Sequence, residues 1–150
     1  MEQRINFLEK GQNAVKSLYG IGGYLAKCTA EQSIMELVAL RVSQINGCAF
    51  CLDMHSKDLR AHGETEQRIY TLNAWRETPF FSEKERAALM WAEAVANCKV
   101  PDETYSEVRK QFSEEELIDL TMQVSATNLW NQINIAFRPL VGTYQPGQYN

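Results

Sequence analysis

The stretch ELVALRVSQINGCAFCLDMHSKDLRAHGE, residues 36–64, contains two helical patterns and the turn that separates them. Asn46 is a typical N-cap residue, and Gly47 permits a tight turn between the two patterns. We therefore expect one helix over residues 31–45 and a second over residues 48–62. The second helix would open with two cysteines three residues apart, and a histidine follows four residues after the second cysteine. The stretch predicts a helical hairpin with its reactive side chains just after the turn.

Helical signals continue through the rest of the chain, whereas strand signals are sparse. Ser82 with Glu85 forms a capping box, in which an N-cap hydroxyl and an N3 carboxylate each accept a backbone amide. Ser113 with Glu116 repeats this pattern before another apolar-periodic run. The glycines of YGIGGY, residues 19–24, weaken the first helix and favour two shorter pieces. We expect an all-α chain whose remaining helices cover residues 10–27, 65–77, 82–98, 102–111 and 113–138.

The size and composition of the chain fit one domain, residues 1–150. With 45% apolar residues, such a chain can bury a core without disulfide bonds. The net charge of −4 and the isoelectric point of 5.2 offer no basic surface to nucleic acid or to an anionic membrane. The chain is charged from its second residue, and no segment approaches the roughly 18 apolar residues of a membrane span. We expect a cytoplasmic protein without nucleic-acid or membrane partners.

Large aromatic side chains recur along the predicted helices. Trp75, Trp91 and Trp130 lie within helices, and Phe80 with Phe81 lies in a connector. Buried aromatic residues dominate protein cores, so core packing is the favoured role. An oligomer interface is the alternative, because a small helical bundle with many large apolar groups gains from self-association.

Cys48, Cys51 and His55 form the chemical centre of the hairpin. Three residues of helix place the two cysteine Cα atoms within the roughly 4.4–6.8 Å that a disulfide tolerates. His55 follows Cys51 by one turn, and its ring leans back toward that sulfur because helical side chains tilt toward the N-terminus. A helix N-terminus also favours the thiolate form of a cysteine. The pair is therefore suited to open and close reversibly.

Glu36 is conspicuous in an otherwise apolar helix. If the two helices are antiparallel about Asn46, then Glu36 and His55 lie at nearly the same level. A carboxylate behind an imidazole fixes its tautomer and assists its proton transfers. The alternative is that Glu36 pairs with Arg41 or with solvent.

Two other uses of the cysteines compete with a redox pair. A structural disulfide is the weaker interpretation, because a domain without a secretion signal normally keeps its thiols reduced. A closed zinc site needs four ligands, and the motif supplies three, with Cys28, Cys98 and His62 as distant candidates for the fourth. His62 precedes the helix stop Gly63, where a cation near the last carbonyls is favourable, so we favour a capping role for it.

The chain resembles the AhpD-like, carboxymuconolactone decarboxylase-like family over nearly its whole length. The resemblance rests on Glu36, eleven intervening residues, Cys48, Cys51 and His55, and on the segments EKERAALMWAEAVA and LWNQINIAFRPLVGTYQPGQ. It implies an all-helical fold of six to seven helices that assembles into trimers or hexamers. It also implies an alkyl hydroperoxide reductase that needs no cofactor or metal. A lipoylated or thioredoxin-like dithiol partner would restore the cysteines.

The resemblance implies that Cys51 attacks the peroxide and Cys48 resolves the product, with His55 and Glu36 assisting. The geometry also favours Cys51 as the attacking cysteine. A charge-assisted hydrogen bond between Cys51 and His55 outweighs the helix-dipole effect of about 1 kcal/mol that favours Cys48. Phe50 stands where the better-studied AhpD enzymes have a second histidine. A non-catalytic redox sensor and a lactone decarboxylase are the alternative functions, although the decarboxylase branch typically lacks the cysteine pair.

Overall fold

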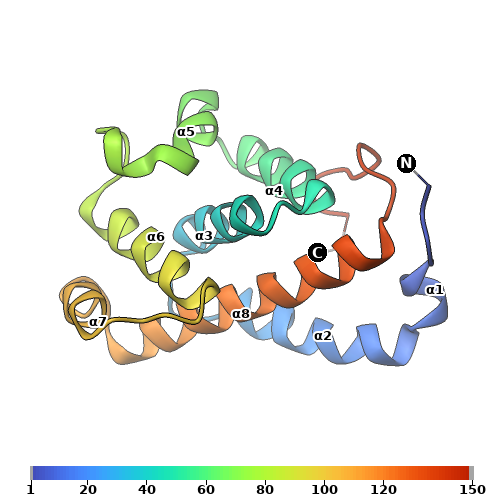
Figure 1. The fold of residues 1–150 in the computed structure, drawn as a ribbon, viewed down its shortest axis with the longest axis horizontal. Coiled ribbons are helices and arrows are strands. Elements are labelled where there is room, and N and C mark those ends of the chain that lie inside the picture. The colour runs from blue at the N-terminus through green and yellow to red at the C-terminus, as the bar shows by residue number, and fades with distance from the viewer. Residues whose placement is uncertain (1, 149–150) are drawn as a thin grey trace.

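Helix α3 (Gln32–Asn46) is the central element of the fold, because its sequence is apolar on most sides. The computed structural model describes residues 2–148, and helices α4, α6 and α8 all pack against α3 (Figure 1). Eight side chains of α3 are buried, which removes most of the helix surface from water. The other elements are α1 (Phe7–Lys10), α2 (Gln12–Leu25), α4 (Ala49–Ala61), α5 (Glu66–Thr71), the 3-10 helix η1 (Leu72–Glu77), α6 (Glu83–Ala96), α7 (Asp102–Val108) and α8 (Glu114–Phe137).

The predicted all-α class is confirmed, since residues 2–148 contain no strand. Both capping boxes are present, at Ser82 before α6 and at Ser113 before α8. The helix predicted over residues 65–77 is divided between α5 and η1, which has a non-helical backbone at Ala74 (φ −115°, ψ 27°). The helix predicted over residues 10–27 is the single helix α2, so the two shorter pieces expected from the YGIGGY glycines are wrong, and α1 precedes it.

The prediction that Asn46 is the N-cap of α4 is wrong. Asn46 is the last residue of α3, and Gly47 follows as its C-cap with a left-handed φ of 67°. Cys48 is the N-cap of α4, with an extended backbone. The connection has the predicted length of two residues but lies one residue later in the chain, because the left-handed Gly47 ends α3 and Cys48 takes the N-cap position.

The buried apolar residues form two clusters, which lie on either side of α3. Trp91 belongs to one cluster and Trp75 with Phe81 to the other, so core packing is confirmed for these three residues. Trp130 is only half-buried and lies on the wall of a cavity. Helix α2 runs along the outer side of α8 (Figure 1), and this arrangement leaves the cavity between α2, α3, α4 and α8.

Candidate active site

Cys48 and Cys51 are joined by a disulfide at the start of α4. Their Cα atoms are 5.3 Å apart, within the distance predicted from helical geometry. Both side chains are 1% exposed. The backbone N–H of Cys51 donates a hydrogen bond to Cys48 Sγ at 3.3 Å, so the sulfur of Cys48 acts as the helix cap. This position stabilises negative charge on Cys48 when the disulfide opens.

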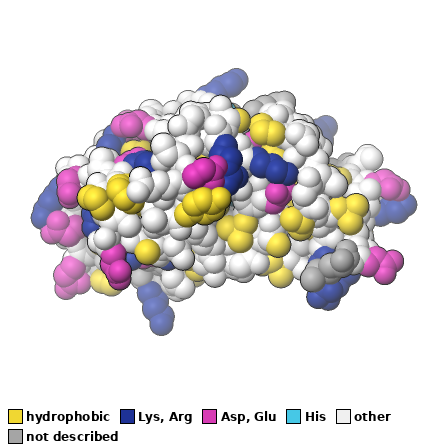
Figure 2. All heavy atoms as spheres, turned by 90° about the horizontal axis from the view of Figure 1, so that it is seen from above, with side chains coloured by type: hydrophobic (Ala, Val, Ile, Leu, Met, Phe, Trp, Pro, Cys, Tyr) yellow, Lys and Arg dark blue, Asp and Glu magenta, His cyan; other side chains and the backbone are white. Residues whose placement is uncertain are grey.

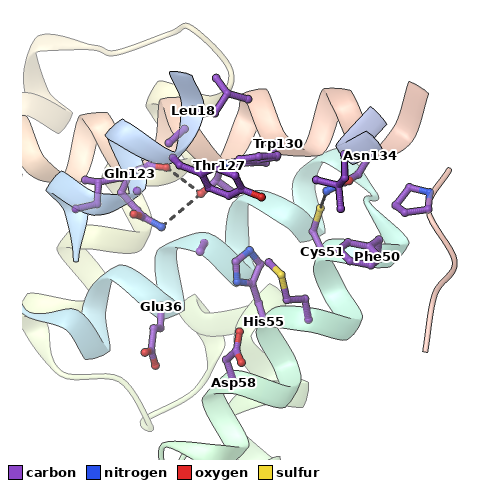
Figure 3. Close-up of a pocket in the computed structure, with 18 of the residues that line it drawn as sticks. Leu18, Glu36, Phe50, Cys51, His55, Asp58, Gln123, Thr127, Trp130 and Asn134 are labelled. Carbon is purple, nitrogen blue, oxygen red and sulfur yellow. Dashed lines mark hydrogen bonds between the residues drawn. The ribbon is translucent and has the colours of Figure 1, made fainter. Parts of the chain in front are cut away.

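A cavity of about 820 Å³ lies beside the disulfide and distinguishes its two ends. Cys51 lines the cavity, whereas Cys48 does not. Figure 3 shows Cys51 and His55 projecting from α4 toward α8, with Phe50 next to Cys51. Of the two cysteines, Cys51 is therefore the one that borders the cavity.

Asn134 contacts the reactive sulfur from the opposite helix. Its Nδ2 donates a hydrogen bond to Cys51 Sγ at 3.3 Å, and the side chain is buried (Figure 3). An amide donor at this distance stabilises a thiolate more than a neutral thiol. Sequence reasoning missed Asn134, which shares one stripe of α8 with Asn128 and Asn131 at intervals of three residues. Buried asparagines repeated at helical spacing were the signal that would have found it.

The other two asparagines of this stripe hold the hairpin turn against α8. Asn46 Nδ2 donates to Asn128 Oδ1 at 2.7 Å and to Asn131 Oδ1 at 2.9 Å. Asn131 Nδ2 in turn donates to Ser43 Oγ of α3 at 3.1 Å. These buried bonds fix the end of α3, and thereby the position of the cysteine pair relative to Asn134.

His55 lies deep in the molecule with its ring on the cavity wall (Figure 3). Desolvation lowers its pKa from 6.5 to about 4, and no charged neighbour among the described residues offsets this effect. The imidazole is therefore neutral near pH 7 and able to accept a proton from a thiol one helical turn away.

Glu36 lines the same cavity, but its partner differs from the predicted one. Glu36 Oε1 lies 2.7 Å from His62 Nδ1, so its ion pair is made with the last turn of α4 and not with His55. In Figure 3 its carboxylate points away from the His55 ring. The predicted alternative partner, Arg41, pairs with Glu93. The α3–α4 hairpin thus places Glu36 one to two turns further along α4 than expected, at the level of His62.

The C-terminal segment after α8 covers one side of α4. Lys57 Nζ donates to the carbonyls of Gly142 and Tyr144 and also pairs with Asp53 Oδ2 at 2.9 Å. Tyr144 is buried, and its hydroxyl donates to Asp58 Oδ1 at 2.8 Å. Because this segment supplies Pro139, Leu140 and Thr143 to the cavity wall, its attachment to α4 helps to shape the site.

The described residues contain no set of side chains arranged to bind zinc. Within residues 2–148, no group of three or more histidine, cysteine or acidic side chains is arranged to hold a metal ion. Cys28 lies between α2 and α3, and Cys98 follows α6; both are free thiols. Across the same residues, no helix has both the length and the apolar character of a membrane span.

Comparison with known proteins places the chain in a family. The model of the carboxymuconolactone decarboxylase family matches residues 21–94. The uncharacterized protein YdfG of Bacillus subtilis is 42% identical over 139 residues, which cover 91% of this chain and 95% of that protein. An alkyl hydroperoxide reductase AhpD of Hyphomonas neptunium is 51% identical over 39 residues, 26% of this chain and 22% of that enzyme.

Solved structures extend the similarity to the whole fold. A protein of unknown function from Agrobacterium tumefaciens, proposed to be an antioxidant defence protein AhpD, has a TM-score of 0.91 and 37% identity over 95% of this chain and all of that one. A variant of the debrominase Bmp8 in complex with 2,3,4-tribromopyrrole has a TM-score of 0.82 over 91% of this chain and 74% of that one. Its identity of 18% makes this a likeness of fold alone. From its sequence and its architecture, this chain belongs to the carboxymuconolactone decarboxylase family and has the all-α AhpD-like fold.

Proposed function

We propose that the protein is a thiol-dependent peroxidase that reduces alkyl hydroperoxides through Cys48 and Cys51. The observation that carries this proposal is the environment of one sulfur. Cys51 Sγ faces the cavity, accepts a hydrogen bond from Asn134 at 3.3 Å, and lies one helical turn from the neutral His55. A base and a thiolate-stabilising donor beside a cysteine that borders a cavity are the features expected of an attacking cysteine.

The first step is attack by Cys51 on the peroxide. His55 accepts the thiol proton, and the thiolate attacks the terminal oxygen of the hydroperoxide as the O–O bond breaks. The alkoxide takes the proton from His55 and leaves as an alcohol, while Cys51 becomes a sulfenic acid. Phe50 occupies the position of the second family histidine, so in this proposal His55 carries the proton transfer at the sulfur by itself.

The second step closes the disulfide. The thiol of Cys48 attacks Cys51 Sγ, the S–O bond breaks, and hydroxide leaves as water with the proton from Cys48. An external dithiol then attacks Cys51 Sγ, which lines the cavity, and Cys48 leaves as a thiolate held at the N-terminus of α4. The second thiol of the reductant releases Cys51. A lipoylated or thioredoxin-like protein remains our proposed source of this dithiol.

Glu36 has a less direct role in this proposal than a hydrogen bond to His55. Since Glu36 and His55 line the same cavity while Glu36 is paired with His62, we assign Glu36 to proton exchange between the cavity and its exposed rim. His62 is the exposed member of that pair, with 58% of its side chain accessible.

Single-turnover trapping of the sulfenic acid tests the proposal. Reduced Cys48→Ser protein should form a trappable sulfenic acid at Cys51 on addition of cumene hydroperoxide, but it should fail to turn over with excess dithiol. Cys51→Ser should lose the rapid reaction altogether. A sulfenic acid that forms rapidly at Cys48 in the Cys51→Ser protein would reverse the assignment.

The same assay separates the alternative functions. A redox sensor oxidises once without cycling when dithiol is in excess, whereas a peroxidase turns over repeatedly. Decarboxylation of a cyclic acid would survive replacement of both cysteines. If the motif thiols of the wild-type protein do not react with any hydroperoxide, peroxidase function is excluded.

Reductive dehalogenation is a second candidate, favoured by the aromatic groups on the cavity wall next to a redox pair. Phe50 and Trp130 line the cavity together with Cys51. A thiolate at Cys51 would attack the halogen, the carbon would take a proton from His55, and Cys48 would displace halide to form the disulfide. Loss of motif thiols on addition of tribromopyrrole, without such loss on addition of hydroperoxide, would favour this function.

A further inference from the structure

One part of the cavity wall beside Cys51 is apolar, and another part carries acidic side chains. We propose that it selects neutral, bulky apolar hydroperoxides and rejects those that carry a carboxylate near the reacting group. This inference rests on the proposed peroxidase function, and it adds the class of substrate.

The apolar part of the wall surrounds the reactive sulfur. Aromatic and aliphatic side chains come from α2, α4, α8 and the segments before α2 and after α8, among them Phe7, Leu18, Phe50, Met54, Trp130 and Leu140. At about 820 Å³ the cavity is in the range of sites that enclose organic molecules much larger than hydrogen peroxide. Burial of apolar surface therefore favours a bulky organic substituent on the peroxide.

The charged part of the wall is acidic. Glu36 and Asp58 both line the cavity, and among its described lining residues there is no lysine or arginine. Figure 3 shows both carboxylates below the His55 ring. Lys57 is adjacent to Asp58 in the sequence, but its amine is held by Asp53 and by two carbonyls of the C-terminal segment.

The two histidines of the wall offer no unpaired cation to a substrate carboxylate. Desolvation keeps His55 neutral, with its pKa lowered to about 4. His62 lies at the exposed rim and is already paired with Glu36 at 2.7 Å. Asp58 accepts a hydrogen bond from the neutral hydroxyl of Tyr144, which does not cancel its charge. A carboxylate on a small substrate would therefore lose hydration without finding an unpaired cation among the described lining residues, and it would also meet the like charge of Asp58.

A matched set of hydroperoxides tests this selection. The probes are cumene hydroperoxide, its para-carboxylate and the methyl ester of that carboxylate, which controls for size. We expect kcat/KM for the carboxylate to be at least about tenfold below that for the ester at neutral pH. Equal values for the carboxylate and the ester would overturn the proposal.

Two substitutions on α4 locate the source of the selection. Asp58→Asn removes a cavity carboxylate. It should lower the ratio of kcat/KM for the ester to kcat/KM for the carboxylate by about threefold or more. Asp53→Asn is the matched control, since Asp53 also binds the C-terminal segment, through Gly142 N–H at 3.1 Å, but does not line the cavity. If Asp53→Asn narrows the ratio as much as Asp58→Asn, the cavity lining is not the cause and the proposal fails.

Binding to the oxidised protein separates this inference from the proposed function. The alcohols that correspond to the ester and the carboxylate are unreactive, and their affinities are measured by calorimetry with the disulfide closed. Tighter binding of the neutral ester alcohol supports the selection even if no hydroperoxide is reduced, in which case only the peroxidase function is lost. Equal binding contradicts the selection whether or not peroxidase activity is found.

Discussion

At the scale of single residues, the surroundings of Cys51 Sγ involve Asn134 and His55. Asn134 lies on α8, and it reaches this sulfur from a position 83 residues away in the sequence. His55 lies on the same helix as the sulfur, and its orientation follows from helical geometry. In the proposed reaction, Cys51 therefore depends on one neighbour from its own helix and one contact from another helix.

Replacement of Asn134 by leucine should raise the pKa of the Cys51 thiol. A hydrogen bond to a charged group contributes about 1.5–3 kcal/mol, so we expect a rise of roughly one to two pKa units. The pH profile of Cys51 alkylation in a Cys48→Ser background, followed by peptide mass spectrometry, measures this pKa. Asn128→Leu is the control, because Asn128 accepts a part-buried hydrogen bond from Asn46, whereas Asn134 donates to Cys51 Sγ. A profile that is unchanged in Asn134→Leu would remove Asn134 from the reaction.

His55 should make folding stability depend on pH between about 4 and 6.5. Its pKa is near 6.5 in the unfolded chain and about 4 in the folded one, so the unfolded chain binds the proton first as pH falls. The stability that His55 contributes is thus present above pH 6.5 and is lost toward pH 4. The shift corresponds to about 3 kcal/mol at most.

Urea unfolding at several pH values measures this dependence. The difference in unfolding free energy between pH 7 and pH 4 should be smaller in His55→Gln than in the wild type. A parallel decline in both proteins would show that other groups cause the acid sensitivity.

At the scale of elements, α2 forms one wall of the cavity. Gly22 lines the cavity, and a Cβ added there meets no other atom within 4 Å. Gly23 also has open space around it but is not part of the cavity wall. This pair of neighbouring glycines separates the effect of filling the cavity from the effect of stiffening the helix.

Gly22→Leu should lower kcat/KM for cumene hydroperoxide more than for hydrogen peroxide, because only the bulky substrate needs the space. Gly23→Leu should leave the ratio of kcat/KM for cumene hydroperoxide to kcat/KM for hydrogen peroxide unchanged. Both variants should stabilise α2, since leucine is better than glycine in a helix by up to about 1 kcal/mol. Thermal unfolding and the two rate constants measure these effects, and equal ratios in both variants would mean that α2 does not border the substrate.

A buried carboxylate fixes the far end of α2 to α8. Asp119 is 2% exposed and accepts hydrogen bonds from Tyr24 Oη at 2.6 Å and from Thr29 N and Oγ1 at 2.9 and 2.8 Å. Desolvation opposes ionisation of Asp119, but these hydrogen bonds hold its pKa below the usual value. The wall that α2 contributes to the cavity is thereby anchored at the end nearest α3.

At the scale of the whole molecule, apolar side chains remain on the surface. Figure 2 shows apolar side chains on the face that it draws. Across the described residues, the exposed large apolar residues include Tyr19, Tyr24, Ile118, Met122, Ile135, Leu140 and Val141. Ile118 and Met122 are one turn apart on α8, on either side of the position of Asp119, which binds Tyr24. Large apolar groups left exposed on a helix are typical of an interface between copies of a chain.

We expect the protein to sediment as a trimer or hexamer at micromolar concentration. Ile118→Glu should shift it toward the monomer, because the substitution places a charge among these apolar groups. Tyr70→Glu is the control, since Tyr70 is 70% exposed and lies on α5, away from α2 and α8. A wild-type monomer in sedimentation velocity would contradict the expectation of self-association.

The sequence by itself determined the helices and the local chemistry of the motif. Apolar periodicity and two capping boxes predicted α3, α4, α6 and α8 to within two residues of their ends, because these signals act between residues at most four apart. The spacing of Cys48, Cys51 and His55 is local in the same sense. It predicted both the disulfide and the face of α4 that the reactive groups share.

Only the tertiary structure decided which side chains from different helices meet. The packing of α3 against α4 pairs Glu36 with His62 instead of His55, about two helical turns further along α4. The packing of α8 brings Asn134 to Cys51 Sγ, and the packing of α2 leaves a cavity that only one of the two sulfurs faces. Helical periodicity specifies which face of each helix is buried, but the depth and rotation at which two buried faces meet depend on all the side chains between them.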